Sequence, residues 1–185
     1  MRQDFSGDDD AKRLAELFPI LLEEHNPAWS AWYEREAAFL RSVFGGGALR
    51  IRHIGSTAVP GLIAKPTVDI LLEVSQDIDL PAMTETMREE GYVVNTPKND
   101  LIMYLKGYTP RGFEGQAAHI HVRHYGDWDE PHFCAYLAAH PGVAEEYGKL
   151  KRVLKERFEH DRDGYTAAKG EFVRKYTELA RRNAL

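Results

Sequence analysis

Residues 53–74, with the sequence HIGSTAVPGLIAKPTVDILLEV, contain the side chains whose types and spacing most clearly suit chemistry. A glycine at a tight turn lets the backbone approach a ligand, and the hydroxyl and amide groups after it can donate hydrogen bonds to phosphate oxygens. Asp69 lies in the apolar run that follows. Together these residue types suit metal-assisted phosphoryl or nucleotidyl transfer, in which positioning and charge neutralisation dominate. The groups expected to contact phosphate are Gly55, Ser56, Thr57 and Lys65.

Asp69 also has a structural interpretation, because a carboxylate within an apolar strand is costly unless it is paired. A salt bridge to Lys65 or Arg52 would satisfy it. Alternate residues of a strand share a face, so Asp69 and Glu73 are expected to point to the same side. We expect Glu73 to be solvated at the end of the strand rather than to bind a metal ion.

His119 and His121 alternate with Ile120 and are therefore expected on one face of a strand. Two imidazoles on one face can bind a transition metal or contact a phosphate group. With His53 and Asp69 they would form a mixed nitrogen and oxygen site. The alternative is a group of histidines that form hydrogen bonds or contact an anion in a polar cleft, without any metal.

Two lysines follow tyrosines at the spacing of neighbouring side chains on a helix. Lys151 follows Tyr147 by four residues. The same spacing separates Lys169 from Tyr165. The pattern is typical of a tyrosine ring packed under a lysine stem. The functional alternative is that both lysines reach into a cleft toward a triphosphate or an acidic substrate.

Composition limits the classes of protein that this chain can represent. Its 185 residues include 24 Lys+Arg and 29 Asp+Glu, a formal net charge of −5, which argues against general nucleic-acid binding. Cys134 is the only cysteine, so neither an internal disulfide nor a multi-thiolate metal site can form. No apolar stretch reaches 18 residues, and the acidic start MRQDFSGDDD is unlike a secretory signal. We expect a cytoplasmic protein that does not act at a membrane.

The periodicity of apolar residues predicts the elements that position these side chains. Strands are expected at residues 48–54, 66–74, 92–95, 101–107 and 117–124, with a possible edge strand at 19–24. Helices are expected at residues 8–18, 27–44, 79–91, 131–139, 142–160 and 165–182. This order predicts one α/β domain over 1–185, with a mixed-sheet core at 19–125 and a helical C-terminal part at 126–185.

The segment HIGSTAVPGLIAKPTVDI at 53–70 resembles the signature of the GrpB family, which is also found fused to bacterial dephospho-coenzyme A kinases. The resemblance extends to the tryptophan-containing helix at 26–40, the HIHV strand at 119–122 and the helical segment at 145–173. A Gly-Ser pair followed by a strand carrying an aspartate also resembles the polymerase-β-like nucleotidyltransferase superfamily. The resemblance implies a nucleotidyltransferase-like fold with a mixed sheet.

The same resemblance implies a nucleotide or other phosphorylated small molecule as ligand, a nucleotide triphosphate as substrate, and Mg²⁺ or Mn²⁺ as cofactor. Asp69 and Ser56 are then the candidate catalytic residues, and Asp69 and His121 the candidate metal ligands. The candidate phosphate-binding residues are His53, Gly55, Ser56, Thr57, Lys65, Lys151 and Lys169. The acceptor of the transferred group is not specified.

The chain departs from these patterns at two places. Leu71 stands where nucleotidyltransferases have a second carboxylate. The segment FCAYLA at 133–138 stands where GrpB relatives read Phe-Arg-Asp-Tyr-Leu-Arg. A non-catalytic nucleotide-binding module is therefore one alternative function. An ATP-dependent ligase or hydrolase on the same scaffold is another.

Overall fold

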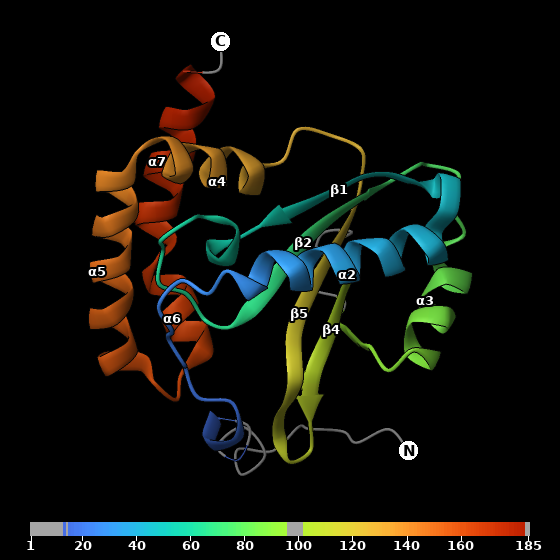
Figure 1. Ribbon diagram of the computed structural model, residues 1–185, viewed down its shortest axis with the longest axis horizontal. Coiled ribbons are helices and arrows are strands. Elements are labelled where there is room, and N and C mark those ends of the chain that lie inside the picture. The colour runs from blue at the N-terminus through green and yellow to red at the C-terminus, as the bar shows by residue number, and fades with distance from the viewer. Residues whose placement is uncertain (1–12, 14, 96–101, 184–185) are drawn as a thin grey trace.

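A five-stranded mixed sheet forms the centre of the computed structural model, which describes residues 13, 15–95 and 102–183 (Figure 1). The strand order is β1-β2-β5-β4-β3. β2 pairs with β5 in parallel, whereas the other neighbouring strands are antiparallel. The mixed α/β fold predicted from the sequence is confirmed. The strands are β1 (Ala48–Ile54), β2 (Thr67–Val74), β3 (Val93–Asn95), β4 (Ile102–Thr109) and β5 (Gly112–His124).

Polar side chains hydrogen-bond to the first turn of each of the two helices that pack on the sheet. The Asn26 side chain accepts a hydrogen bond from the backbone amide of Ala28 at 2.9 Å. Asp79 accepts one from the amide of Ala82 at 3.0 Å. The first of these helices ends at Gly45, whose φ of 51° suits glycine. The two helices are α2 (Ala28–Phe44) and α3 (Leu80–Glu89).

One face of the sheet packs against α2 and α3, and a period of two decides which residues lie on it. Even-numbered residues of β2 and β5, such as Ile70 and Ile120, are fully buried in this core with Trp29 and Leu40 of α2. The odd-numbered residues of the same strands must therefore face the opposite side of the sheet. That second face carries the candidate site.

The chain after the sheet forms a helical part that lies across from this second face (Figure 1). Its own core includes Phe133, Leu137 and Tyr147, which pack with Val59 and Leu62 from the connection between β1 and β2. The described residues include no helix long and apolar enough to cross a membrane. The helices of this part are α4 (Asp129–Ala139), α5 (Pro141–Phe158), α6 (Arg162–Ala168) and α7 (Gly170–Asn183).

The predicted edge strand at 19–24 is wrong, because this segment does not join the sheet. Its backbone exchanges hydrogen bonds between Glu23 and Ala64, and the amide of Ile20 donates to the carbonyl of Glu159 at 2.7 Å. The segment thus runs between the helical part and the connection that precedes β2.

Two of the predicted helices differ in extent. The helix predicted at 165–182 is divided into α6 and α7, which meet at Lys169 and Gly170. Of the helix predicted at 8–18, residues 13 and 15–17 are helical, and residues 8–12 and 14 lie outside the described residues.

Glu73 is not solvated, contrary to the sequence-based expectation, although it lies on the same face as Asp69. Its side chain is fully buried. Its carboxylate pairs with Arg52 at 2.8 Å and with Arg50 at 3.3 Å, and it accepts a hydrogen bond from the amide of Gly126 at 3.1 Å. A buried carboxylate needs such partners, so Glu73 joins β1 to the chain that leaves β5.

We expect Glu73→Gln to lower the free energy of unfolding by about 3 kcal/mol, because it removes the charge that Arg50 and Arg52 share. The matched control is Glu85→Gln, at a surface pair with Arg88, which should change stability by less than about 0.5 kcal/mol. Chemical denaturation measures both. Equal effects of the two substitutions would contradict a structural role for Glu73.

Candidate functional site

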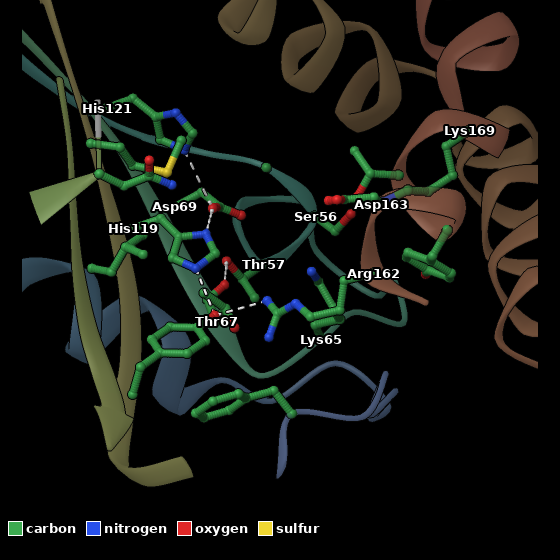
Figure 2. A pocket seen from close by; sticks show the side chains of 18 of the residues that line it. Ser56, Thr57, Lys65, Thr67, Asp69, His119, His121, Arg162, Asp163 and Lys169 are labelled. Carbon is green, nitrogen blue, oxygen red and sulfur yellow. Dashed lines mark hydrogen bonds and ion pairs between the residues drawn. The ribbon is translucent and has the colours of Figure 1, made fainter. Parts of the chain in front are cut away.

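A cavity of about 1780 Å³ lies between the second face of the sheet and the helical part (Figure 2). The predicted phosphate contacts Gly55, Ser56, Thr57 and Lys65 line it. Asp69, His121, Lys151 and Lys169 line it as well. Residues of the turn after β1 and residues of the C-terminal helices, which are distant in the sequence, therefore line the same cavity.

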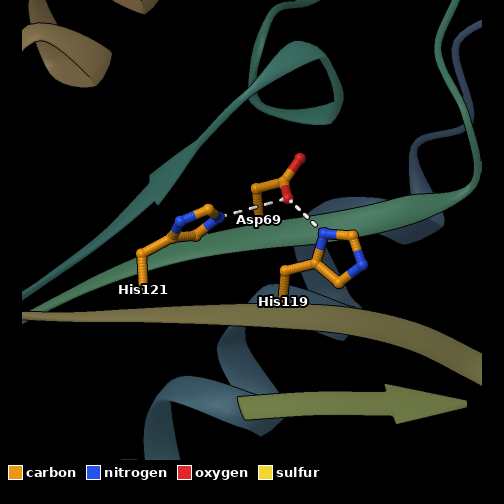
Figure 3. A group of neighbouring side chains, drawn as sticks. All are labelled: Asp69, His119 and His121. Carbon is orange, nitrogen blue, oxygen red and sulfur yellow. Dashed lines mark hydrogen bonds and ion pairs between the residues drawn. The ribbon is translucent and has the colours of Figure 1, made fainter. Parts of the chain in front are cut away.

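Asp69, His119 and His121 form the polar centre of this cavity (Figure 3). Parallel pairing places Asp69 of β2 directly beside His119 of β5. The Oδ1 atom of Asp69 lies 3.0 Å from Nδ1 of His119 and 3.5 Å from Nε2 of His121. Asp69 is thus paired with two imidazoles, and neither Lys65 nor Arg52 forms a salt bridge with it in the described structure.

The Asp69 carboxyl group is held in its charged form by these imidazoles. Burial alone would raise its pKa, but hydrogen bonds and charge interactions with His119 and His121 outweigh burial and hold the pKa well below the usual range. Asp69 is therefore ionised at neutral pH. A charged oxygen beside two ring nitrogens presents three ligand atoms to one point in the cavity.

A chain of hydrogen bonds connects this centre to α6. The Tyr108 hydroxyl lies 2.7 Å from Nε2 of His119, and Arg162 donates to the same hydroxyl at 3.0 Å. Burial raises the pKa of Tyr108, so its hydroxyl keeps the proton that it can donate. In a neutral His119 ring, the Nδ1 proton is donated to Asp69, and Nε2 accepts from Tyr108. The chain fixes the orientation of the His119 ring.

Gly55 allows the turn after β1 to lie against Asp69. Its φ of 72° and ψ of −173° belong to a region that essentially only glycine occupies. A Cβ atom at this position would lie 2.5 Å from Oδ2 of Asp69. Gly55, predicted to let the backbone approach a ligand, therefore also lets the turn pack against the Asp69 carboxylate.

His53 lies on the other face of the sheet, away from Asp69. Its ring stacks on Tyr33 of α2, with ring centroids 4.9 Å apart. Its Nε2 atom lies 3.0 Å from the hydroxyl of Thr57, which donates its own proton to the Thr67 carbonyl at 3.2 Å. Nε2 of His53 must therefore be the donor in that contact. Burial lowers the pKa of His53 to about 4, so the ring is neutral.

This placement changes the interpretation of two predicted residues. His53 supports the turn through Thr57 and does not complete a site with Asp69, because adjacent positions of β1 point to opposite faces. The Thr57 side chain is buried and its hydroxyl is engaged by His53 and Thr67. Ser56 lines the cavity one residue earlier, and Figure 2 shows its hydroxyl on the side of the helical part.

Cationic side chains line one wall of the cavity, which we call the cationic wall. They come from α5, from α6 and its C-terminal end, and from the connection before β2: Lys151, Arg162, Lys169 and Lys65. The Lys169 ammonium lies 4.2 Å from the centroid of the Tyr165 ring, and Lys65 lies 6.0 Å from the same ring. The Lys151 ammonium lies 4.7 Å from the Tyr147 centroid and donates to the carbonyl of Ile63. The predicted packing of lysine over tyrosine is present in both helices, and the lysines also face the cavity.

Burial and mutual repulsion weaken the charged forms of these lysines. Burial, together with the nearby charge of Lys169, lowers the pKa of Lys151 to about 7. Burial and Lys65 lower the pKa of Lys169 to about 8, against an opposing effect of Asp69. The pKa of Lys65 is also lowered by burial and by Arg162. An anion in this part of the cavity would relieve the repulsion.

Sequence reasoning missed Tyr108 and Arg162. Tyr108 lies in β4, which pairs with β5, and Arg162 begins α6, so neither is near residues 53–74 in the sequence. Arg162 also occurs in the highly charged segment KRVLKERFEHDRD, where no local pattern distinguishes it from solvated surface residues. The alternation in the strand identified His119 together with His121, but the resemblance implied only His121 as a metal ligand.

The family described as GrpB protein matches residues 19–179 of this chain. The chain belongs to the GrpB family. It is 33% identical over 161 residues to UPF0157 protein YqkA of Bacillus subtilis, covering 85% of this chain and 46% of that protein. The crystal structure of the conserved protein GrpB from Enterococcus faecalis is 26% identical with a TM-score of 0.79, covering 89% of this chain and 99% of that one.

A dephospho-CoA kinase of Mycolicibacterium paratuberculosis contains a related segment, 27% identical over 182 residues that cover 84% of this chain and 44% of the kinase. This agrees with the predicted occurrence of GrpB-like segments within such kinases. The GrpB chain described here spans about half the length of the kinase and of YqkA.

Two departures of this GrpB chain now have structural consequences. Leu71, at the position of a second carboxylate, is fully buried, so Asp69 has no acidic neighbour at the alternate position of β2. Cys134 on α4 donates to the carbonyl of Gly55 at 3.5 Å. Burial raises the pKa of its thiol to about 12, so it is a packed side chain and not a thiolate nucleophile.

We expect Gly55→Ala to displace the Asp69 carboxylate and break its contact with His119. The strained backbone should also lower the free energy of unfolding by about 1–3 kcal/mol. The imidazole signals of His119 and His121 in NMR spectra report the displacement directly.

Gly61→Ala is the matched control, because Gly61 also has a positive φ, 75°, but a Cβ atom there meets nothing within 4 Å. This substitution should leave the imidazole signals unchanged. Unchanged signals in Gly55→Ala would contradict the role of Gly55 in supporting Asp69.

We expect the buried Lys151 to make stability depend on pH. Between its folded pKa of about 7 and the unfolded value near 10.4, the unfolded chain binds a proton that the folded chain has lost. The free energy of unfolding should therefore rise with pH, from about pH 7.5 to 9.5, by up to about 1.4 kcal/mol per unit relative to Lys151→Met.

Denaturation at several pH values measures this difference. The control Lys149→Met, two residues away on the exposed side of α5, should show the pH dependence of the unmodified chain. The same slope in Lys151→Met would show that Lys151 does not cause it.

Proposed function

We propose that this GrpB-family chain binds a nucleotide or another phosphorylated small molecule in the cavity between the sheet and the helical part. One observation carries the proposal: Lys65, Lys151, Lys169 and Arg162 converge on the cavity, and among the described residues none of them forms an ion pair with a carboxylate. Ammonium and guanidinium groups are the usual protein partners of phosphate.

The lowered lysine pKa values support an anionic ligand. Lys169 and Lys65 repel each other and lose solvation on burial, so a phosphate chain that contacts both would favour their protonated forms. Arg162 faces the same space and is charged at all relevant pH values. Gly55 and Ser56 line the same cavity, where the backbone amide and the hydroxyl could donate hydrogen bonds to the phosphates.

Metal-assisted nucleotidyl transfer is the reaction that we propose for this site. Asp69 and His121 would hold a divalent ion, Mg²⁺ or Mn²⁺ by resemblance, and the ion would offset charge on the phosphates. The chain itself would orient the triphosphate through Ser56 and the lysines. The acceptor would form a bond to the α-phosphorus as the bond from that phosphorus to the bridging oxygen breaks. Its proton would pass to solvent, and pyrophosphate would leave toward the lysines.

A second candidate, binding without turnover, is favoured by a specific observation. Leu71 stands at the alternate position and Glu73 is held by Arg50 and Arg52, so β2 supplies the cavity with one carboxylate where two are needed for a two-metal clamp. Binding through the lysines and Arg162 does not need that clamp. The two candidates therefore share a ligand and differ in whether pyrophosphate is released.

We expect ATP to bind the chain with uptake of protons near pH 8, because the ligand restores charge on Lys169. Lys169→Gln should weaken binding ten- to a hundredfold and reduce the proton uptake. Isothermal titration calorimetry in buffers of different ionisation enthalpy measures both quantities.

Lys149→Gln is the control, since this lysine pairs with Glu145 on the exposed side of α5. It should bind ATP as the unmodified chain does. Absence of ATP and pyrophosphate binding would refute the proposed function. Release of pyrophosphate would support transfer, and binding without release would favour the second candidate.

A further inference from the structure

We propose that Asp69, His119 and His121 form a three-ligand site that selects a single first-row transition-metal dication over Mg²⁺. The inference deepens the proposed function, because it names the ion at the centre of the same cavity. It narrows the Mg²⁺ or Mn²⁺ that the resemblance implies to transition-metal ions, and it makes His119 a ligand beside Asp69 and His121, without His53. It depends on the three side chains and not on the cationic wall.

The spacing of the ligand atoms suits one ion. The three side chains offer atoms that all lie within 4.8 Å of one another. Ligands bonded at about 2.1 Å to one ion, at angles between square and tetrahedral, lie about 3.0–3.4 Å apart. Oδ1 of Asp69 is 3.0 Å from Nδ1 of His119 and 3.5 Å from Nε2 of His121, so small rotations suffice.

The backbone fixes this arrangement before any ion binds. β2 and β5 are adjacent, parallel, central strands of the sheet, and Asp69 is paired with His119 in their register. His121 follows two residues later on the same face, next to the buried Leu71. Ligands on rigid strands lose little freedom on binding, which favours tight binding of a metal ion.

The donor set decides which class of ion fits. Mg²⁺ prefers oxygen ligands in an octahedron, and this centre offers one carboxylate and two imidazoles. Two histidines and one carboxylate are typical of zinc and of non-haem iron centres that leave positions open for a substrate. The open positions here would face the cavity, where the phosphates are proposed to bind.

Groups around the three ligands provide the support that metal sites need. Tyr108 holds the far nitrogen of His119 at 2.7 Å, and Arg162 holds Tyr108 at 3.0 Å. With a metal on Nδ1, the Nε2 proton of His119 would be donated to Tyr108, which reverses one hydrogen bond without moving a ring. Gly55 lets the turn pack against the second oxygen of Asp69.

The test is a titration of the metal-free full chain, without a histidine tag, with Zn²⁺, Co²⁺ and Mg²⁺ alone. We expect one Zn²⁺ or Co²⁺ per chain and binding of Mg²⁺ at least a hundredfold weaker. The near-ultraviolet spectrum of bound Co²⁺ should lack a thiolate charge-transfer band, which would exclude Cys134 as a ligand. Zinc binding no tighter than that of Mg²⁺, or no binding of zinc, would overturn the inference.

Variants assign the ligands. His119→Gln, His121→Gln and Asp69→Asn should each weaken zinc binding at least tenfold, and Tyr108→Phe about tenfold through the orientation of His119. His132→Gln is the control, because His132 forms a histidine–aspartate pair with the exposed Asp127 and does not line the cavity. Unchanged zinc binding in both histidine variants would refute the site.

Two further measurements keep the outcomes separate. Circular dichroism of each metal-free variant tests its folding, and Tyr108→Phe, which retains all three ligands, remains informative where a ligand variant does not fold. Pyrophosphate binding to the metal-free chain tests the cationic wall alone. Pyrophosphate binding without zinc binding would overturn this inference and leave the proposed function standing. Zinc binding without pyrophosphate binding would support this inference and count against the proposed function.

Discussion

The parallel pairing of β2 with β5 is the constraint on which the rest of the site depends. It places Asp69 beside His119 on the second face of the sheet and leaves even-numbered apolar residues of both strands, such as Ile70 and Ile120, on the first face, under α2. A parallel pair needs a long crossover, and here the crossover contains α3, β3 and β4. The same crossover returns through β4, which brings Tyr108 to the far side of His119. One strand pairing thus determines both the ligand atoms and the group that orients them.

The helical part completes the cavity because the turn after β1 serves both halves of the chain. Val59 and Leu62 extend from this turn into the core of the helical part. Gly55, at the beginning of the same turn, lies against Asp69. The distance between the carboxylate and the cationic wall is therefore set by one short segment that packs on both sides. This explains how side chains from α5 to α7 can face a centre built on the sheet.

Period-two patterns in the sequence predicted the sheet and much of its site. The alternation in 66–74 and 117–124 placed the carboxylate and the imidazoles correctly, because local periodicity decides which face a residue occupies. The same rule, applied to 48–54, places His53 on the face of Leu49 and Ile51, opposite the face of its neighbour Ile54. Partners such as Arg162 could not be predicted, because no local pattern reports which distant strand or helix lies next to a residue.

Asp69 and Glu73 lie on the same face of one strand, yet their partners give them different roles. Glu73 is fully buried and held by Arg50 and Arg52, whose guanidinium groups keep their charge at every relevant pH. Such a pair has no alternative state, so it serves stability. Asp69 is paired with imidazoles, which can give up a proton and bind a metal ion with the freed nitrogen. Its side chain is 28% exposed and faces the cavity. The strand therefore contains one carboxylate that is fixed by its partners and one that can exchange them for a ligand.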